Sequence, residues 1–206
     1  MVPKPGNPRL TAAAAAAILL ALAGCGETPT GSGQQSAVAP SSPMNTGTYA
    51  EGQPVTSKFS EFEDATAITY HQPEVPKGAN AVTVVKAAGN GTAVSLKVEG
   101  LAPNREFGAH VHVNVCGKSG HLAGPHYQNK KDPVQPSVDP AYANPKNEVW
   151  LDFKTDQDGN AQVDSTVDWK FRAGEGRSIV IHAMPTMTEK GKAGTAGERL
   201  ACLNIR

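Results

Sequence analysis

The chain has few aromatic residues, few cysteines and no excess of charge of either sign. Only 5% of its 206 residues are Phe, Trp or Tyr, and 19 Lys and Arg balance 19 Asp and Glu. A chain without a basic excess lacks the electrostatic footprint of a nucleic-acid-binding protein. Glycine and proline are plentiful, with 21 and 16 residues, and no segment shows a persuasive helical pattern. The composition therefore favours a loop-rich β protein over a helical bundle.

The first 24 residues have the proportions of a secretory signal. Lys4 and Arg9 precede an apolar stretch, residues 10–22, that is too short to span a bilayer comfortably. The stretch leads into Leu-Ala-Gly-Cys, which resembles the bacterial lipobox, where cleavage precedes a lipid-carrying cysteine. We predict a lipoprotein signal peptide over residues 1–24, a lipidated Cys25, and an exported protein anchored to the membrane of the cell envelope. An ordinary secretory signal with an incidental cysteine is the alternative.

Residues 25–60 are rich in Gly, Pro, Ser, Thr and Gln, which predicts a flexible linker. From residue 61 the pattern becomes β, and we predict a single all-β domain over residues 61–206, a sandwich or barrel. Its eight expected strands lie at 65–70, 81–87, 92–98, 106–113, 148–154, 161–167, 178–183 and 200–205. The stretch 117–147 has no strand pattern, and loops of that length usually serve a function.

Two turns are prominent in this β pattern. Gly89-Asn90-Gly91 separates two alternating segments and is a strong hairpin signal. The acidic stretch 156–160 is predicted to be a second hairpin turn. It also partly matches a calcium loop, but Lys154 stands where an acidic ligand is needed, so a plain turn is favoured.

Two cysteines remain after Cys25 is set aside. In an exported protein, an even pair predicts one disulfide, here between Cys116 and Cys202. Two free buried thiols are the less favoured alternative.

Four histidines and one arginine in the C-terminal half are the strongest functional signal. His110 and His112 lie two apart on an expected strand, so both rings point to one face. His182 lies in an apolar strand, where a histidine needs a partner, and His126 follows a Gly-Pro turn. Imidazole suits copper, zinc, iron and nickel. With Arg199 as a nearby cation, the set predicts a redox-metal site that attracts an anion.

The ordered motifs GAHVHV, a cysteine, AGPHYQ, IVIHAM and AGERLAC resemble those of the copper/zinc superoxide dismutase family, over roughly residues 61–206. The resemblance implies an eight-stranded Greek-key β-barrel with a Cys116–Cys202 disulfide. It implies that Arg199 lies at the mouth of the copper channel and acts on the substrate. Four histidines would bind copper: His110, His112, His126 and His182.

The chain departs from this family where zinc would bind. After His126, which matches the histidine that bridges the two metals, the loop contains no further histidine. Asp132 and Asp139 are present outside the family's ligand context, and we expect them to be solvated. We therefore predict a copper cofactor without zinc, and expect the second nitrogen of His126 to bond to a loop carboxylate, a carbonyl or water.

Three other groups have weaker assignments. His121 precedes His126 and is expected to be a surface residue, with an extra metal contact or a proton relay as alternatives. His71 is expected to be structural or exposed. Lys190 and Lys192 either add to the positive field near Arg199 or serve as solubilising charge.

The resemblance implies conversion of superoxide to oxygen and hydrogen peroxide by Cu(II)/Cu(I) cycling. An exported copper-buffering protein with little dismutase activity is the alternative, because zinc shapes the site in this family. A structural β-sandwich with a vestigial site is a third reading, which retention of all four histidines disfavours.

Overall fold

The computed structural model describes residues 51–61 and 65–205. In these residues the chain forms nine strands and one short 3-10 helix, η1 (Gly120–Ala123). The strands are β1 (Val55–Ser60), β2 (Ala67–Thr69), β3 (Asn80–Ala88), β4 (Gly91–Glu99), β5 (Glu106–His112), β6 (Phe153–Lys154), β7 (Ala161–Val167), β8 (Ser178–His182) and β9 (Arg199–Asn204). The predicted signal peptide and Cys25 lie outside the described residues, and no described helix is long and apolar enough to span a membrane.

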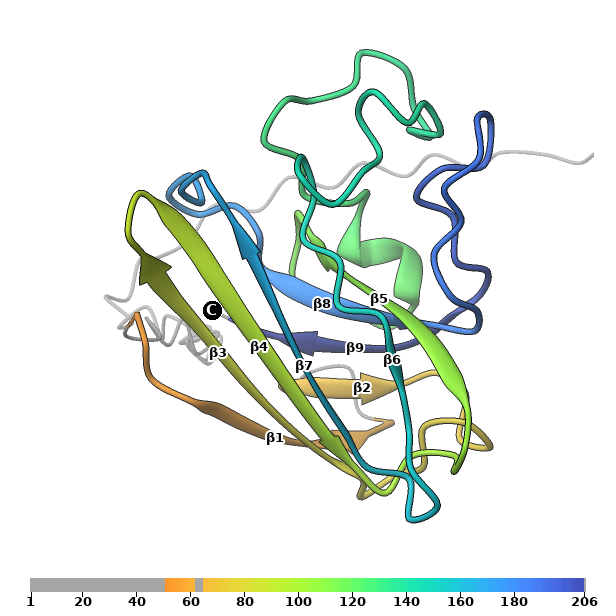
Figure 1. Cartoon of the computed structure of the whole chain (residues 1–206). Helices are drawn as coiled ribbons and strands as arrows, with labels where there is room; N and C mark the ends of the chain where they lie inside the picture. Colours follow the sequence, from red (N-terminus) through yellow and green to blue (C-terminus); the bar gives the residue numbers. More distant parts are fainter. Residues whose placement is uncertain (1–50, 62–64, 206) are drawn as a thin grey trace, which may run out of the picture. The chain divides into compact units, whose positions relative to one another are not determined.

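The nine strands form one sheet in the order β6-β5-β8-β9-β2-β1-β3-β4-β7, which curls into a nearly closed barrel (Figure 1). Neighbours are antiparallel except β1 and β2, which pair in parallel. The predicted all-β barrel is confirmed. Each of the eight expected strands has a counterpart: the strand expected at 161–167 matches β7 at both ends, the one expected at 148–154 is reduced to the two residues of β6, and the others have shifted ends.

The additional strand, β1, lies in the segment predicted to be linker. Its residues alternate buried and exposed, with Val55, Ser57 and Phe59 facing the interior. Its residues Val55–Lys58 pair with Thr83–Asn80 of β3. The folded domain thus begins at least six residues before the predicted boundary at residue 61.

The two predicted hairpins have different outcomes. Gly89 and Asn90 form the two-residue turn between β3 and β4, and Gly89 has φ 58°. β6 and β7 do not pair with each other: β6 pairs with β5, and β7 pairs with β4. The turn between them is held by the Asp156 carboxylate, whose Oδ1 accepts bonds from the backbone N–H groups of Asp158 and Asn160 (2.9 and 2.8 Å). A turn is therefore present at 156–160, but it does not join two paired strands as predicted.

The core and the loops lie on opposite faces of β5. Phe107, Ala109 and Val111 belong to the apolar core, while the alternate residues His110 and His112 face the other way and are also buried. The long connections after β5 and between β8 and β9 lie together on the upper side of the strands in Figure 1, in green to teal and in blue. The loops, rather than the barrel interior, therefore enclose the histidines.

Candidate metal centre

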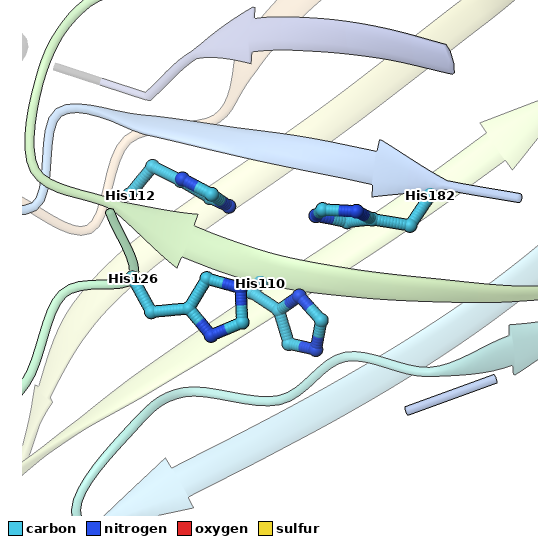
Figure 2. A group of neighbouring side chains, drawn as sticks. All are labelled: His110, His112, His126 and His182. Carbon is cyan, nitrogen blue, oxygen red and sulfur yellow. The ribbon is translucent and has the colours of Figure 1, made fainter. Parts of the chain in front are cut away.

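The four predicted histidines converge on one point. His110 and His112 come from β5, His182 ends β8, and His126 follows η1, where it bridges to His112. One nitrogen from each ring lies within 4.8 Å of the others, and Figure 2 shows the rings turned toward one another. Ring centroids are as close as 4.0 Å, between His110 and His126. Strands distant in sequence thus supply a preformed cluster of nitrogen donors.

Three ring nitrogens in this cluster are buried without a hydrogen-bond partner: Nδ1 of His110, Nε2 of His112 and Nε2 of His182. Buried polar atoms are nearly always paired, and an unpaired one costs about 1–3 kcal/mol. Three such atoms aimed at one point indicate a ligand that all three can bind at once. A metal ion fits, because each neutral imidazole offers it a nitrogen lone pair.

The opposite nitrogen of each ring is bonded to the protein, which orients the ring. His110 Nε2 contacts Thr186 Oγ1 (2.6 Å), and His112 Nδ1 contacts the Gly124 carbonyl (2.9 Å). His182 Nδ1 makes a longer contact to the Gly197 carbonyl (3.4 Å). Such outer bonds fix both the tautomer and the direction of a metal-binding histidine.

The outer partner of His126 is Glu148, which the sequence reasoning missed. Glu148 Oε2 accepts bonds from His126 Nδ1 (2.8 Å) and Trp150 Nε1 (2.7 Å), and Oε1 accepts one from Gln128 Nε2 (2.7 Å). The side chain is 1% exposed. A buried carboxylate therefore accepts a hydrogen bond from the His126 nitrogen that would face a second metal. A carboxylate is one of the three kinds of partner expected from the sequence for this nitrogen.

Removal of one acceptor oxygen from Glu148 should lower the free energy of unfolding. Glu148→Gln places an amide N–H₂ against N–H donors, and disrupting such a buried pair costs about 3 kcal/mol. Urea denaturation of the metal-free protein measures the loss of unfolding free energy. Glu189→Gln, at an exposed position, is the matched control. Equal stability of the two variants would contradict this account of Glu148.

Burial sets the protonation of the cluster. It lowers the pKa of His110 and His112 well below the usual range, and repulsion by His126 lowers both further. Burial likewise lowers the pKa of His182 to about 3. These rings are therefore neutral near pH 7, which is the form that binds a metal.

The metal-free protein should lose stability in acid because of these three rings. Their unfolded-state pKa is about 6.5, and burial lowers the folded-state pKa of all three, so below pH 6.5 the unfolded chain binds protons that the folded protein does not. Stability from this source is complete above pH 6.5 and falls with pH, by up to about 4 kcal/mol per unit for three imidazoles. Denaturation midpoints from pH 7.5 to 4.5 measure the slope. A flat profile between pH 7 and 5 would show that the rings titrate normally.

An open pocket of about 640 Å³ leads to the cluster, and its lining includes His126, His182 and Arg199. Nη1 of Arg199 donates to the Gly120 carbonyl (2.8 Å), the one hydrogen bond of this guanidinium among the described residues. A Cβ at Gly120 would lie 2.7 Å from Arg199 Cβ, so only glycine permits this packing. Burial lowers the pKa of Arg199, but a guanidinium stays charged. Arg199 therefore places a positive charge in the lining of this pocket.

The remaining candidate residues lie apart from the cluster. Asp132 Oδ2 accepts from Ser137 Oγ (2.7 Å) and Oδ1 from the backbone of Val134 (2.8 Å), so this carboxylate is buried in the loop rather than solvated as expected. Asp139 accepts from the backbone of Ala141. Among the described residues, no second group of His, Cys, Asp or Glu is arranged to hold a metal.

The two other histidines and the two lysines are peripheral. His121 is exposed at the pocket rim, and His71 bonds to Glu74. Lys190 and Lys192 are exposed and do not line the pocket.

Cys116 and Cys202 form a disulfide with a sequence separation of 86 residues. It ties the segment between β5 and η1 to β9. The same segment is held by the Tyr70 hydroxyl, which donates to the Gly117 carbonyl (2.8 Å), and by Asn204 Oδ1, which accepts from Cys116 N–H (2.8 Å). The loop that carries Gly120 and His126 is therefore anchored at several points.

These features define a class: a nearly closed β-barrel that bears an accessible four-histidine metal site under its loops. The sequence pattern of copper/zinc superoxide dismutase matches residues 78–205. The chain belongs to that family, as the motifs predicted.

One solved structure supports this fold. A Cu/Zn superoxide dismutase from Brucella abortus is 18% identical, with a TM-score of 0.51, covering 75% of this chain and 100% of that one. Two mutants of a SOD-like protein from Bacillus subtilis are 16% and 14% identical, with TM-scores of 0.46 and 0.48. They cover 61% and 68% of this chain and 88% and 97% of their own. The search of curated proteins found no match.

Proposed function

We propose that this protein is a copper-dependent superoxide dismutase that works without zinc. The observation that carries the proposal is the convergence of three buried, unpartnered imidazole nitrogens beside a pocket that Arg199 lines. The family supplies the choice of copper among the metals that imidazole binds.

The absence of zinc is proposed from the surroundings of His126. Glu148 accepts its Nδ1–H and is itself buried and bonded to Gln128 and Trp150. This network gives His126 the orientation that a second metal provides elsewhere in the family. A fixed carboxylate acceptor also stabilises the ring without a bound ion.

When bound, copper supplies one-electron chemistry, taking an electron from one superoxide and giving one to the next. The chain's residues do the remaining work. The four histidines would hold the metal beside the pocket, and the Arg199 guanidinium would attract and orient the anion. Four N–H donors of Arg199 remain after its bond to Gly120, so it can hold a diatomic anion without leaving its anchor.

The test is superoxide consumption by the full chain loaded with copper, with metal analysis of the same sample. We expect rapid turnover with one copper and no tightly bound zinc, and no turnover for His182→Ala. Tight copper binding with little turnover would instead make the protein a copper buffer. One tightly bound zinc per copper would overturn the zinc-free assignment.

We also propose that Cys25 carries a lipid that anchors the domain to a membrane of the cell envelope. The support is the Leu-Ala-Gly-Cys motif after a short apolar stretch. Cys25→Ser should move the protein from the membrane fraction to the soluble exported fraction. Retention on the membrane would contradict the anchor.

A further inference from the structure

The outer partner of His110 differs in kind from those of the other three histidines. His112 and His182 face backbone carbonyls, and His126 faces a carboxylate. These oxygens only accept, so each of those rings must carry its proton on Nδ1. His110 instead faces the hydroxyl of Thr186 through Nε2. A hydroxyl can donate or accept, so this contact alone does not fix the tautomer.

Asp152 settles the direction of the Thr186 hydroxyl. Thr186 Oγ1 lies 2.7 Å from Asp152 Oδ1, and Asp152 Oδ2 accepts the Thr186 backbone N–H at 2.7 Å. Asp152 Oδ1 also accepts from the Ala109 backbone N–H (3.3 Å). A carboxylate accepts only, so the single hydroxyl hydrogen of Thr186 must point to Asp152. The hydroxyl oxygen is then left as the acceptor for His110 Nε2–H.

We propose that Asp152, acting through Thr186, is a positioning residue that fixes the tautomer of His110. A proton on Nε2 leaves the lone pair on Nδ1, which is the buried, unpartnered atom aimed at the cluster. The opposite tautomer would place a hydrogen on Nδ1, where the metal must bind. Of the three buried rings with an unpartnered nitrogen, His110 alone faces the cluster through Nδ1. The hydrogen bonds from Asp152 through Thr186 to His110, here called the relay, keep that nitrogen unprotonated, which is the form that binds a metal.

The local fold brings this relay together. Asp152 follows Trp150 on the segment before β6, and Thr186 lies on the connection between β8 and β9. A Cβ at Gly108 of β5 would lie 2.6 Å from the Met184 carbonyl oxygen and 3.3 Å from Thr186 Oγ1. The bare glycine therefore lets this connection approach β5 closely enough for Thr186 to reach His110.

The inference rests on the proposed metal site, but its readout uses metal-free protein. Ring ¹⁵N chemical shifts at pH 7.5 distinguish protonated from unprotonated nitrogens, and a His110→Gln variant assigns the resonances. In the wild type we expect Nε2–H on His110 and Nδ1–H on the other three rings. A wild-type His110 protonated on Nδ1 would overturn the proposal, whatever the folding of any variant.

Two variants test the relay itself. Asp152→Asn can donate to Thr186 and reverse its hydroxyl, and Thr186→Val removes the hydroxyl at nearly constant shape. Both should populate Nδ1–H on His110 and weaken copper binding about 10- to 100-fold in a chelator competition. Thr186→Ser should restore both properties.

The matched controls are Asp164→Asn and Thr166→Val, at exposed positions on β7. Both should match the wild type in tautomer and copper affinity. Retention of Nε2–H in both relay variants overturns the proposal even if copper binding weakens, because that pattern would reflect a structural role. A protein that binds copper but consumes superoxide poorly would refute the proposed function and leave this inference standing.

Discussion

Arg199→Glu should slow superoxide consumption by about one to three orders of magnitude while copper stays bound. The side chain lines the same pocket as His126 and His182. Replacing a fixed positive charge there with a negative one turns attraction of the anion into repulsion. Focused positive potential raises association rates by about 10- to 1,000-fold, and that range sets the expected loss.

The measurement is the rate of superoxide consumption at several salt concentrations, with copper content determined in each sample. The wild-type rate should fall as salt rises, because screening weakens attraction. The Arg199→Glu rate should lose or reverse that dependence. Arg199→Lys should be intermediate, since it keeps the charge but loses the planar fork of donors.

Lys190→Glu is the matched control, because it changes the net charge equally at an exposed position outside the pocket lining. We expect a small effect from it. If the two reversals slow turnover equally, the protein's overall charge rather than Arg199 would guide the substrate. Unchanged turnover in copper-loaded Arg199→Glu would remove Arg199 from the mechanism.

The barrel could be read from the sequence because its strands carry a strong period-two pattern. The strand β1 was missed because its neighbours are Pro, Ser, Thr and Gln, a composition that resembles a linker, although Val55 and Phe59 do alternate. The predicted pairing of β6 with β7 was wrong, because a turn signal indicates that the chain reverses direction but not which strands become partners. β6 and β7 lie at opposite ends of the sheet, each beside its partner, β5 or β4.

The histidines could be predicted because each lies in a recognisable motif, but their outer partners could not. Glu148, Trp150 and Asp152 alternate with the buried residues Val149, Leu151 and Phe153. That alternation places the two carboxylates on one face of the segment, and it is the available sequence signal that they could act together near the site. Their pairing with His126 and Thr186 depends on how the loops fold over β5, and no local spacing encodes that.

Loss of the Cys116–Cys202 disulfide should remove about 4–5 kcal/mol from the free energy of unfolding. The bond spans 86 residues, and closing a loop of that length in the unfolded chain accounts for this amount in the chain-entropy model. A double Cys116→Ala, Cys202→Ala variant, compared with oxidised wild type by urea denaturation, measures the loss. A decrease below about 1 kcal/mol would show that native contacts, rather than the bond, dominate here.

The same variant should also impair the site. The disulfide anchors the segment that contributes the Gly120 carbonyl to Arg199 and leads into His126. Without it, the bonds from Tyr70 to Gly117 and from Cys116 N–H to Asn204 remain, each with a net value of about 1 kcal/mol. We therefore expect the folded variant to bind copper more weakly. Hydrogen exchange should report this as an increase in amide exchange, relative to the wild type, that is larger at 117–126 than in β3 and β4. Uniform exchange across both regions would show that the loop is held independently of the bond.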